Sequence, residues 1–387
     1  AGAIVSFADY AATWQTSAVT VVPNGTDKIG SVNQNAILNT QGQSVTFVFV
    51  DSTQGWINTM DSTSNVRGAP PFIQASVSGA CNTLVTAPCC ANAKIATFTG
   101  PGSFTVTAAA LCAANNIVSH LIVAGGGSGG TGCSGGGAGA GGFREVKSPI
   151  TPYTASPLDG YSTPANRVTV TAQTYSIVVG GGAPGQATAP NSCNSDGTRG
   201  NNSSFGGIIS TGGGAGGDGP AGPEGPGGSG GGGGHSSGTA GNGNTPPVSP
   251  AQGFNGRPSQ PATGPAPSDA GGAGGGATAA GTCGSSGHQG GAGATTSISA
   301  TPTAYAGGGG GSNRCGGTSG DVAGGAGGGG RGASNPRPRP AFDGTGQNGT
   351  ANTGGGGGAG GSLVSGGPIG GTGSGGSGIV IIRYKFQ

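Results

Sequence analysis

Alternation of apolar and polar residues predicts short β-strands in the first third of the chain. The clearest alternating run is 44–51, and a period of two is typical of a half-buried strand. Further strands are predicted at 4–7, 18–22, 72–77, 95–98 and 103–107, with Gly- and Pro-rich turns between them. Short strands at this spacing indicate a β-sandwich or jelly-roll-like module. Trp14 and Trp56 are the large side chains expected to anchor its core.

Two strongly apolar runs bracket the rest of the chain. They cover residues 117–124 and 378–384, and we expect them to pair and to close a second domain. Weaker strand signals lie between them, at 142–146, 174–179, 205–210 and 295–305. The expected domains are therefore a β-rich attachment or packing module over 1–116 and a glycine-rich domain over 117–387.

Composition changes the picture of the second domain. The chain has 387 residues and 95 glycines, and all but nine of these glycines follow residue 124. Glycine in a helix costs about 1 kcal/mol per residue relative to alanine, so a helical protein is excluded. A collagen helix is excluded too, because the 26 prolines are few and glycine does not occupy every third position.

The glycines are concentrated in separate runs. The runs cover 125–142, 180–185, 212–234, 271–276, 307–311, 324–332 and 354–361. A left-handed three-residue helix makes no internal hydrogen bonds, so its N–H and C=O groups must bond to neighbouring helices, and only glycine allows that close an approach. We expect an all-β plus polyglycine-II fold, in which an N-terminal β-sandwich-like module precedes a bundle of such helices closed by β-strands. The alternative is that the runs are flexible linkers.

The order of motifs in the second domain resembles a known family. The segments His120 to Gly127 (HLIVAGGG), 141–146 (GGFREV), 175–182 (YSIVVGGG), 304–311 (AYAGGGGG), 349–358 (GTANTGGGGG) and 375–384 (GGSGIVIIRY) resemble the glycine-rich domain of tail-fibre and other virion proteins of tailed phages. Segments 7–14 (FADYAATW) and 24–29 (NGTDKI) are similar to modules of cyanophage structural proteins.

The resemblance implies a tail fibre or fibre-tip adhesin on the virion surface, outside the cell. It further implies a homotrimer, contacts with other virion proteins, and a glycan or protein receptor on the host cell, bound by the distal loops of a polyglycine-II bundle. The alternatives are a self-assembling extracellular filament or a capsid-decorating protein without a receptor. An ice-binding protein is a weaker candidate, because no regular threonine ladder supports it.

Catalytic and cofactor chemistry finds little support in the sequence. The GxGxxG pattern at 125–130 is not followed by a helix-forming segment, so it does not predict a nucleotide site. The aspartates are isolated in turn-like surroundings, the three histidines are scattered, and no CxxC occurs. We therefore expect no enzyme activity, no cofactor and no metal. A net charge of +2 argues against nucleic-acid binding, and no apolar run is long enough for membrane insertion.

Eight cysteines are candidates for disulfides, since their even number is compatible with an oxidising medium. Their pairing cannot be deduced from sequence. Four of them could form disulfides at the end of the first domain: Cys81, Cys89, Cys90 and Cys112. The other four lie beside glycine runs and could join neighbouring helices: Cys133, Cys193, Cys283 and Cys315.

Segments between the glycine runs are richer in aromatic and charged residues. If the runs form a bundle, segments 148–167, 184–204, 235–269 and 333–347 are loops at its ends. Aromatic and arginine side chains in such loops could stack on sugars or contact a cell-surface protein. The predicted receptor-binding residues are Tyr153, Tyr161, Phe254, Arg257, Arg337, Arg339 and Phe342. The alternative is that they are solvated turn residues or trimer contacts.

Overall fold

The chain divides into two compact units, unit 1 (Ala1–Pro70) and unit 2 (Pro71–Gln387). The structure, a computed structural model, describes residues 2–62, 72–88, 92–132, 134–187, 195–219, 225–235, 238–260, 270–282, 288–312, 322–333, 344–361 and 370–387. The division between the units lies earlier than the boundary expected at residue 116. The reason is strand pairing, because the strands between residues 74 and 108 pair within unit 2.

The protein is all-β, with small antiparallel sheets in both units. Within the described residues, helical structure is limited to two short 3-10 turns, η1 (Ala113–Asn116) and η2 (Pro164–Asn166). The all-β class is thus confirmed for the described residues.

The described part of unit 1 contains two small sheets. One has the strand order β1 (Ile4–Ala8), β4 (Ser44–Asp51), β5 (Gly55–Ser62). The other is a ribbon of β2 (Val19–Val21) and β3 (Ala36–Leu38).

The core of unit 1 is small. Its fully buried apolar side chains are Leu38, Val45 and Phe47, and Trp14 and Trp56 pack against them while remaining partly exposed. Both tryptophans thus belong to the core that the sequence assigned to them, although neither is fully buried.

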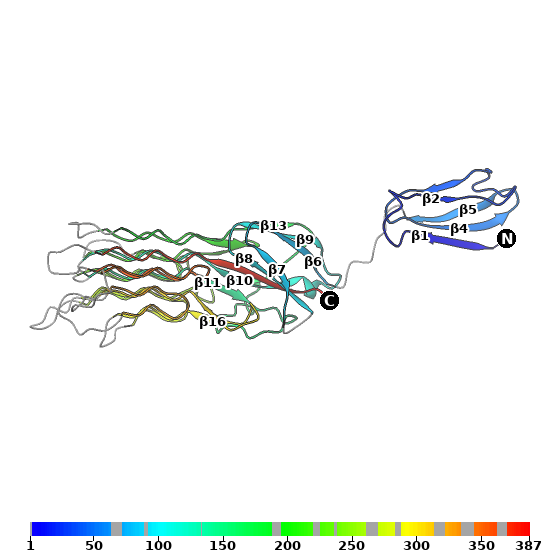
Figure 1. Cartoon of the computed structure of the whole chain (residues 1–387). Coiled ribbons are helices and arrows are strands. Elements are labelled where there is room, and N and C mark those ends of the chain that lie inside the picture. Colours follow the sequence, from blue (N-terminus) through cyan, green and yellow to red (C-terminus); the bar gives the residue numbers. More distant parts are fainter. Residues whose placement is uncertain are drawn as a thin grey trace, which may run out of the picture. The chain divides into compact units, whose positions relative to one another are not determined.

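The main sheet of unit 2 joins strands from both ends of the unit. Its order is β11 (Phe143–Val146), β10 (Ile117–Val123), β18 (Ile379–Lys385), β8 (Ala93–Phe98) and β7 (Thr83–Thr86). A short strand, β12 (Val168–Thr169), also pairs with β10. In the β10–β18 pair Leu121 lies opposite Ile381, so the predicted pairing of the two apolar runs is confirmed (Figure 1).

Smaller sheets cover both faces of the main sheet. The sheet of β6 (Gln74–Ser78), β9 (Gly102–Ala108) and β13 (Thr174–Ile177) supplies Phe104, Val106 and Ile177 to one apolar cluster, with the hairpin of β14 (Ser203–Phe205) and β15 (Ile208–Ser210) beside it. The hairpin of β16 (Ala294–Thr296) and β17 (Thr303–Tyr305) supplies Ala294 and Tyr305 to the other. Because both faces are covered, β10 and β18 are buried along almost their whole length.

His120 is a buried titratable group on the face of the main sheet that is covered by the β6–β9–β13 sheet. Its side chain is 1% exposed, packs edge-on against the Phe205 ring, and neither ring nitrogen has a hydrogen-bond partner. Burial, and secondarily the nearby Arg144 guanidinium, lowers the pKa of His120 from 6.5 to about 3. His120 is therefore a packed residue of the core.

We expect acid to destabilise unit 2 through His120. Below pH 6.5 the unfolded chain binds a proton at this imidazole that the folded chain cannot bind until about pH 3, so stability falls as the pH drops through this window. At pH 4.5 the loss is about 3 kcal/mol, since one pKa unit corresponds to about 1.4 kcal/mol. The variant His120→Phe should lose less stability than the wild type in urea unfolding at pH 4.5, and equal losses would contradict this role. Burial raises the pKa of Glu145, so this group makes unit 2 more stable as the pH falls. Its contribution is the same in the wild type and in the His120→Phe variant.

Glycine tracts extend from the strands of unit 2 and lie side by side (Figure 1). We use the name glycine array for the described glycine-rich tracts between Ala124 and Gly378, which hydrogen-bond to one another. Its inner tracts are buried although they carry almost no side chains. The burial is of backbone against backbone, so its polar groups must be satisfied within the array.

The tract 134–142 donates its hydrogen bonds with a period of three. Bonds to tract 211–219 run from Gly136 to Gly217, Gly139 to Gly214 and Gly142 to Thr211. Bonds to tract 270–277 run from Gly137 to Gly272 and Ala140 to Gly275, and bonds to tract 354–361 run from Ala138 to Gly357 and Gly141 to Gly354. Each third residue therefore faces the same neighbour.

The carbonyl groups of the same tract accept from a different set of neighbours. Gly127 and Gly130 donate to Gly139 and Gly136, Ser229 and Gly232 donate to Ala140 and Gly137, and Gly309 and Ser312 donate to Ala138 and Gly135. Tract 134–142 thus donates to three tracts and accepts from three others. A β-strand, by contrast, has hydrogen-bonded neighbours on only two sides.

Steric exclusion explains why these positions are glycine. A Cβ atom on Gly139 would overlap the carbonyl oxygen of Ser229 and lie 2.7 Å from its carbonyl carbon. At Gly130 a Cβ would overlap the carbonyl oxygen of Gly217 and lie 2.6 Å from its carbonyl carbon. Gly181, on the exposed side of the array, differs, because a Cβ there would meet nothing nearer than the Asn201 side-chain nitrogen at 3.7 Å.

Candidate recognition surface at the distal end of the glycine array

The described tracts of the array end together at the side of unit 2 that lies away from the strands (Figure 1). We call this the distal end. Among the described residues it includes Gly132, Asp196, Asp218, Gln260, His288, Ser312, Gly344 and Gly361. Several of these residues precede or follow segments that the structure does not describe.

Side-chain hydrogen bonds join neighbouring tracts at the distal end. The Asp218 N–H donates to the Asp196 carboxylate at 3.0 Å, and the Gln186 side-chain amide donates to the Asp196 carbonyl at 2.6 Å. The Ser195 N–H donates to the Thr131 hydroxyl at 3.1 Å. These bonds fix the ends of the tracts, so that the connecting segments begin from defined positions.

Tract 253–260 carries a stripe of exposed side chains. Positions 253, 256 and 259 are buried against the array, whereas Phe254, Arg257 and Gln260 are exposed. Phe254 is 42% exposed, and its N–H donates to Gly276 at 3.0 Å. The Arg257 N–H donates to Ala273 at 2.8 Å. Three-residue spacing thus places an aromatic ring, a guanidinium and an amide on one line along a backbone held rigidly by its neighbours.

The stripe ends beside His288. The Gln260 side-chain oxygen lies 3.3 Å from the His288 Nε2 atom, and His288 is 2% exposed. Burial lowers the pKa of His288, and the Arg257 charge lowers it further. The sequence analysis did not predict Gln260 or His288 as members of this surface. The three-residue spacing of positions 254, 257 and 260 is the signal that could have identified Gln260.

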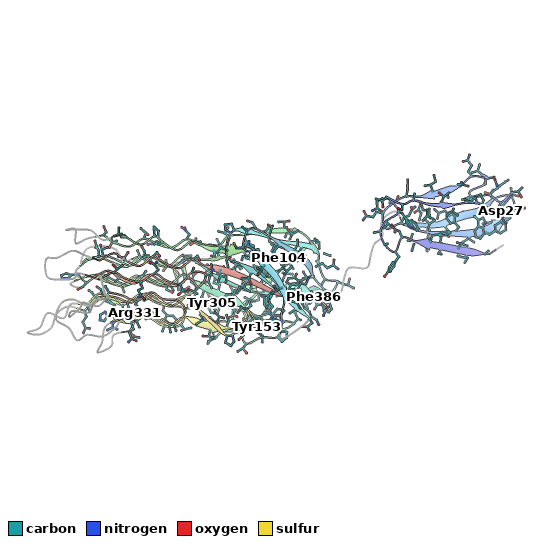
Figure 2. The ribbon with its side chains drawn as sticks, viewed as in Figure 1. Asp27, Phe104, Tyr153, Tyr305, Arg331 and Phe386 are labelled. Carbon is teal, nitrogen blue, oxygen red and sulfur yellow. The ribbon has the colours of Figure 1, made fainter. Side chains whose placement is uncertain are left out.

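Two predicted receptor-binding residues lie at the opposite end, among the strands. Tyr153 is partly buried against the second apolar cluster, and the Arg383 guanidinium lies 5.3 Å from its ring (Figure 2). Tyr161 stacks under Arg167, whose guanidinium carbon lies 4.3 Å from the ring centroid. Neither tyrosine joins Phe254 and Arg257, so the predicted residues do not form one surface.

Tyr153 belongs to a buried polar network around Glu145. The Glu145 carboxylate accepts bonds from the Ser156 N–H at 2.9 Å and from the Thr296 hydroxyl. Burial raises the pKa of Glu145, and burial together with the Glu145 charge raises the pKa of Tyr153. This network is internal, and it ties the 148–167 segment to β11 and β16.

The remaining residues were predicted to form disulfides or to bind a receptor, and they divide into two groups. Cys81 and Cys112 have free, exposed thiols. The others lie outside the described residues: Arg337, Arg339, Phe342, Cys89, Cys90, Cys133, Cys193, Cys283 and Cys315.

The described residues lack two further features. They contain no group of three or more His, Cys, Asp or Glu side chains that could hold a metal ion. In the same residues no helix has both the length and the apolar character needed to cross a membrane.

Comparison with known proteins gives one match. A family model described as a glycine-rich domain matches residues 98–385. No curated protein matches the chain, and no solved structure matches it. The matched segment begins at the last residue of β8 and ends at the last residue of β18, so it covers β10, β11, β12 and β18 of the main sheet together with the glycine array, and leaves out β7 and nearly all of β8. Since this match spans well over half of the chain, the protein belongs to the glycine-rich domain family.

Proposed function

We propose that the tracts of the glycine array are polyglycine-II helices. The observation that carries this proposal is the three-residue period of the bonds made by tract 134–142, which donates to three neighbours and accepts from three others. A left-handed helix with three residues per turn aims successive N–H groups in three directions. The steric exclusion of a Cβ at Gly130 and Gly139 agrees with such close packing.

We further propose that the protein is a non-enzymatic virion component, a tail fibre or fibre-tip adhesin of a tailed phage. Two observations support this function. The motif order of unit 2 resembles the glycine-rich domain of such proteins, and the described tracts end together at the distal end. A rigid array whose tracts end together suits the presentation of that end to a surface.

The receptor in this proposal is a glycan or a protein on the host cell. Exposed aromatic rings and guanidinium groups on rigid backbone are suited to either target, because they bind at low entropic cost. Phe254 and Arg257 are such groups within the described residues. Assembly as a trimer with other virion proteins, at the virion surface, forms part of the same proposal.

Cell adsorption tests this function. The labelled full chain should adsorb to at least one strain in a panel of cyanobacteria. A five-site variant, with serine at Arg337, Arg339, Phe342, Phe254 and Arg257, should reduce adsorption at least about tenfold, because the loss of a single residue that contributes about 1.4 kcal/mol lowers the affinity tenfold. Thr20→Ser and Val32→Ser in unit 1, both exposed, serve as the matched control. Undiminished adsorption of the five-site variant, or assembly of the protein along a filament in electron micrographs, would contradict the adhesin proposal.

A further inference from the structure

Unit 1 contains an open apolar pocket that the proposed function does not use. Its volume is about 240 Å³. It lies between the two small sheets, and its walls include Phe7, Val21, Ile29, Phe47 and Trp56. The match to the glycine-rich domain family begins only at residue 98, so family membership assigns nothing to this pocket.

The walls of the pocket suit a flat, apolar group. Phe7 and Phe47 meet edge to face, with ring centroids 6.3 Å apart, and Trp56 meets the Phe49 ring at 5.5 Å in a similar geometry. A further aromatic ring can pack edge to face or offset-stacked against such rings. A closed apolar cavity of about 150 Å³ holds benzene, so the space is sufficient for one six-membered ring with a short side chain.

The polar groups that line the pocket set the charge of the ligand. The only charged residue among its lining residues is Asp27, which is partly buried and is labelled on unit 1 in Figure 2. The Asp27 backbone is held in place, because its N–H donates to Asn24 at 2.9 Å and its carbonyl accepts from the Asn33 side chain at 2.6 Å. Among the described residues no hydrogen bond or ion pair reaches its carboxylate oxygens. The carboxylate is therefore available to a cationic group at the edge of an aromatic site.

We propose that this pocket binds a small aromatic amine. The ring lies among Phe47, Ile29 and Trp56, and the ammonium group, on a stem of one or two carbons, bonds to the Asp27 carboxylate. The site resembles other small-molecule pockets in its composition, which combines mostly apolar walls with few polar groups that fix orientation.

Phenethylamine tests the proposal, with phenylacetate as the comparator of opposite charge and the same ring. Trp56 lines the pocket, so its indole N–H signal in a two-dimensional NMR titration of the full chain reports binding at the site. We expect saturable binding of phenethylamine with a Kd of about 1 mM or below, as suits a fragment of this size, and weaker binding of phenylacetate. Asp27→Asn should weaken phenethylamine binding about three- to tenfold and leave phenylacetate binding no weaker.

Asp61→Asn is the matched control, since Asp61 lies on β5 of the same unit and does not line the pocket. It should leave both affinities unchanged. Equal affinity for the two probes, or no saturation by about 10 mM phenethylamine, would overturn the proposal. So would a concentration-dependent shift of the Trp56 signal without added probe, because a second copy of the chain would then fill the pocket.

Discussion

Replacing Gly139 by alanine is expected to destabilise unit 2 by about 3 kcal/mol or more. The new methyl group would overlap the Ser229 carbonyl and lie within 2.8 Å of the Gly230 carbonyl carbon. These atoms belong to backbone that is itself hydrogen-bonded on several sides, so it cannot yield as a flexible side chain would. Hydrogen exchange of unit 2 amides in increasing urea measures the effect.

The matched control is Gly181→Ala. A methyl group at this exposed position meets ordinary van der Waals distances, with the nearest atom 3.7 Å away. It should be neutral or stabilise the fold by up to about 1 kcal/mol, because alanine restricts the unfolded chain. Both tryptophans, Trp14 and Trp56, lie in unit 1, so the tryptophan fluorescence transition should be the same in both variants. Equal stability of the two variants in unit 2 would contradict the close packing of the array.

Replacing Ile381 by aspartate is expected to prevent unit 2 from folding at neutral pH. Ile381 is 1% exposed, lies on β18 in the centre of the main sheet and packs in the second apolar cluster. A carboxylate there would be buried among apolar side chains, and the methyl groups that fill the cluster would be lost. We therefore expect a loss of stability of about 4 kcal/mol or more, which is at the upper end for one substitution. Circular dichroism and limited proteolysis measure the loss.

Ile209→Asp provides the comparison for this prediction. Ile209 lies on β15 of the same unit, but its side chain is 53% exposed. The change should alter stability by less than about 0.5 kcal/mol, as is usual for exposed positions. If Ile381→Asp folds as well as Ile209→Asp, the main sheet does not close unit 2.

The strands could be predicted where apolar residues alternate with polar ones or form a continuous run. The run at 44–51 matches β4, and the apolar runs at 117–124 and 378–384 match β10 and β18. β5 was missed, because its register shifts against β4 and its side chains are mostly exposed, which removes the alternation. The short strands β3 and β7 carry too few residues to show a period.

The unit boundary could not be predicted from composition. The glycine content rises near residue 124, but β8 pairs with β18 and β9 pairs with β13. Strand pairing across this long separation in sequence leaves no local signal. As a result, residues 74–108 belong to unit 2 although their composition is that of unit 1.

The candidate surface was predicted only in part. Phe254 and Arg257 were expected in a loop at an end of the bundle, but they lie on a hydrogen-bonded tract of the array. Tyr153 was expected to be accessible, yet it packs beside the buried Arg383. Both differences arise from the fold, because exposure along a tract depends on neighbours that are distant in the sequence.

Hydrogen exchange of the amides in tract 134–142 tests the central claim most directly. The N–H groups from Gly136 to Gly142 each donate to a carbonyl of a neighbouring tract, so an ordered array must open before they exchange. NMR of the full chain should find them protected to a degree similar to the amides of β10 and β18. Exchange at the rate of an unstructured peptide, while β10 and β18 remain protected, would show that the tracts do not form an ordered array and would contradict the account.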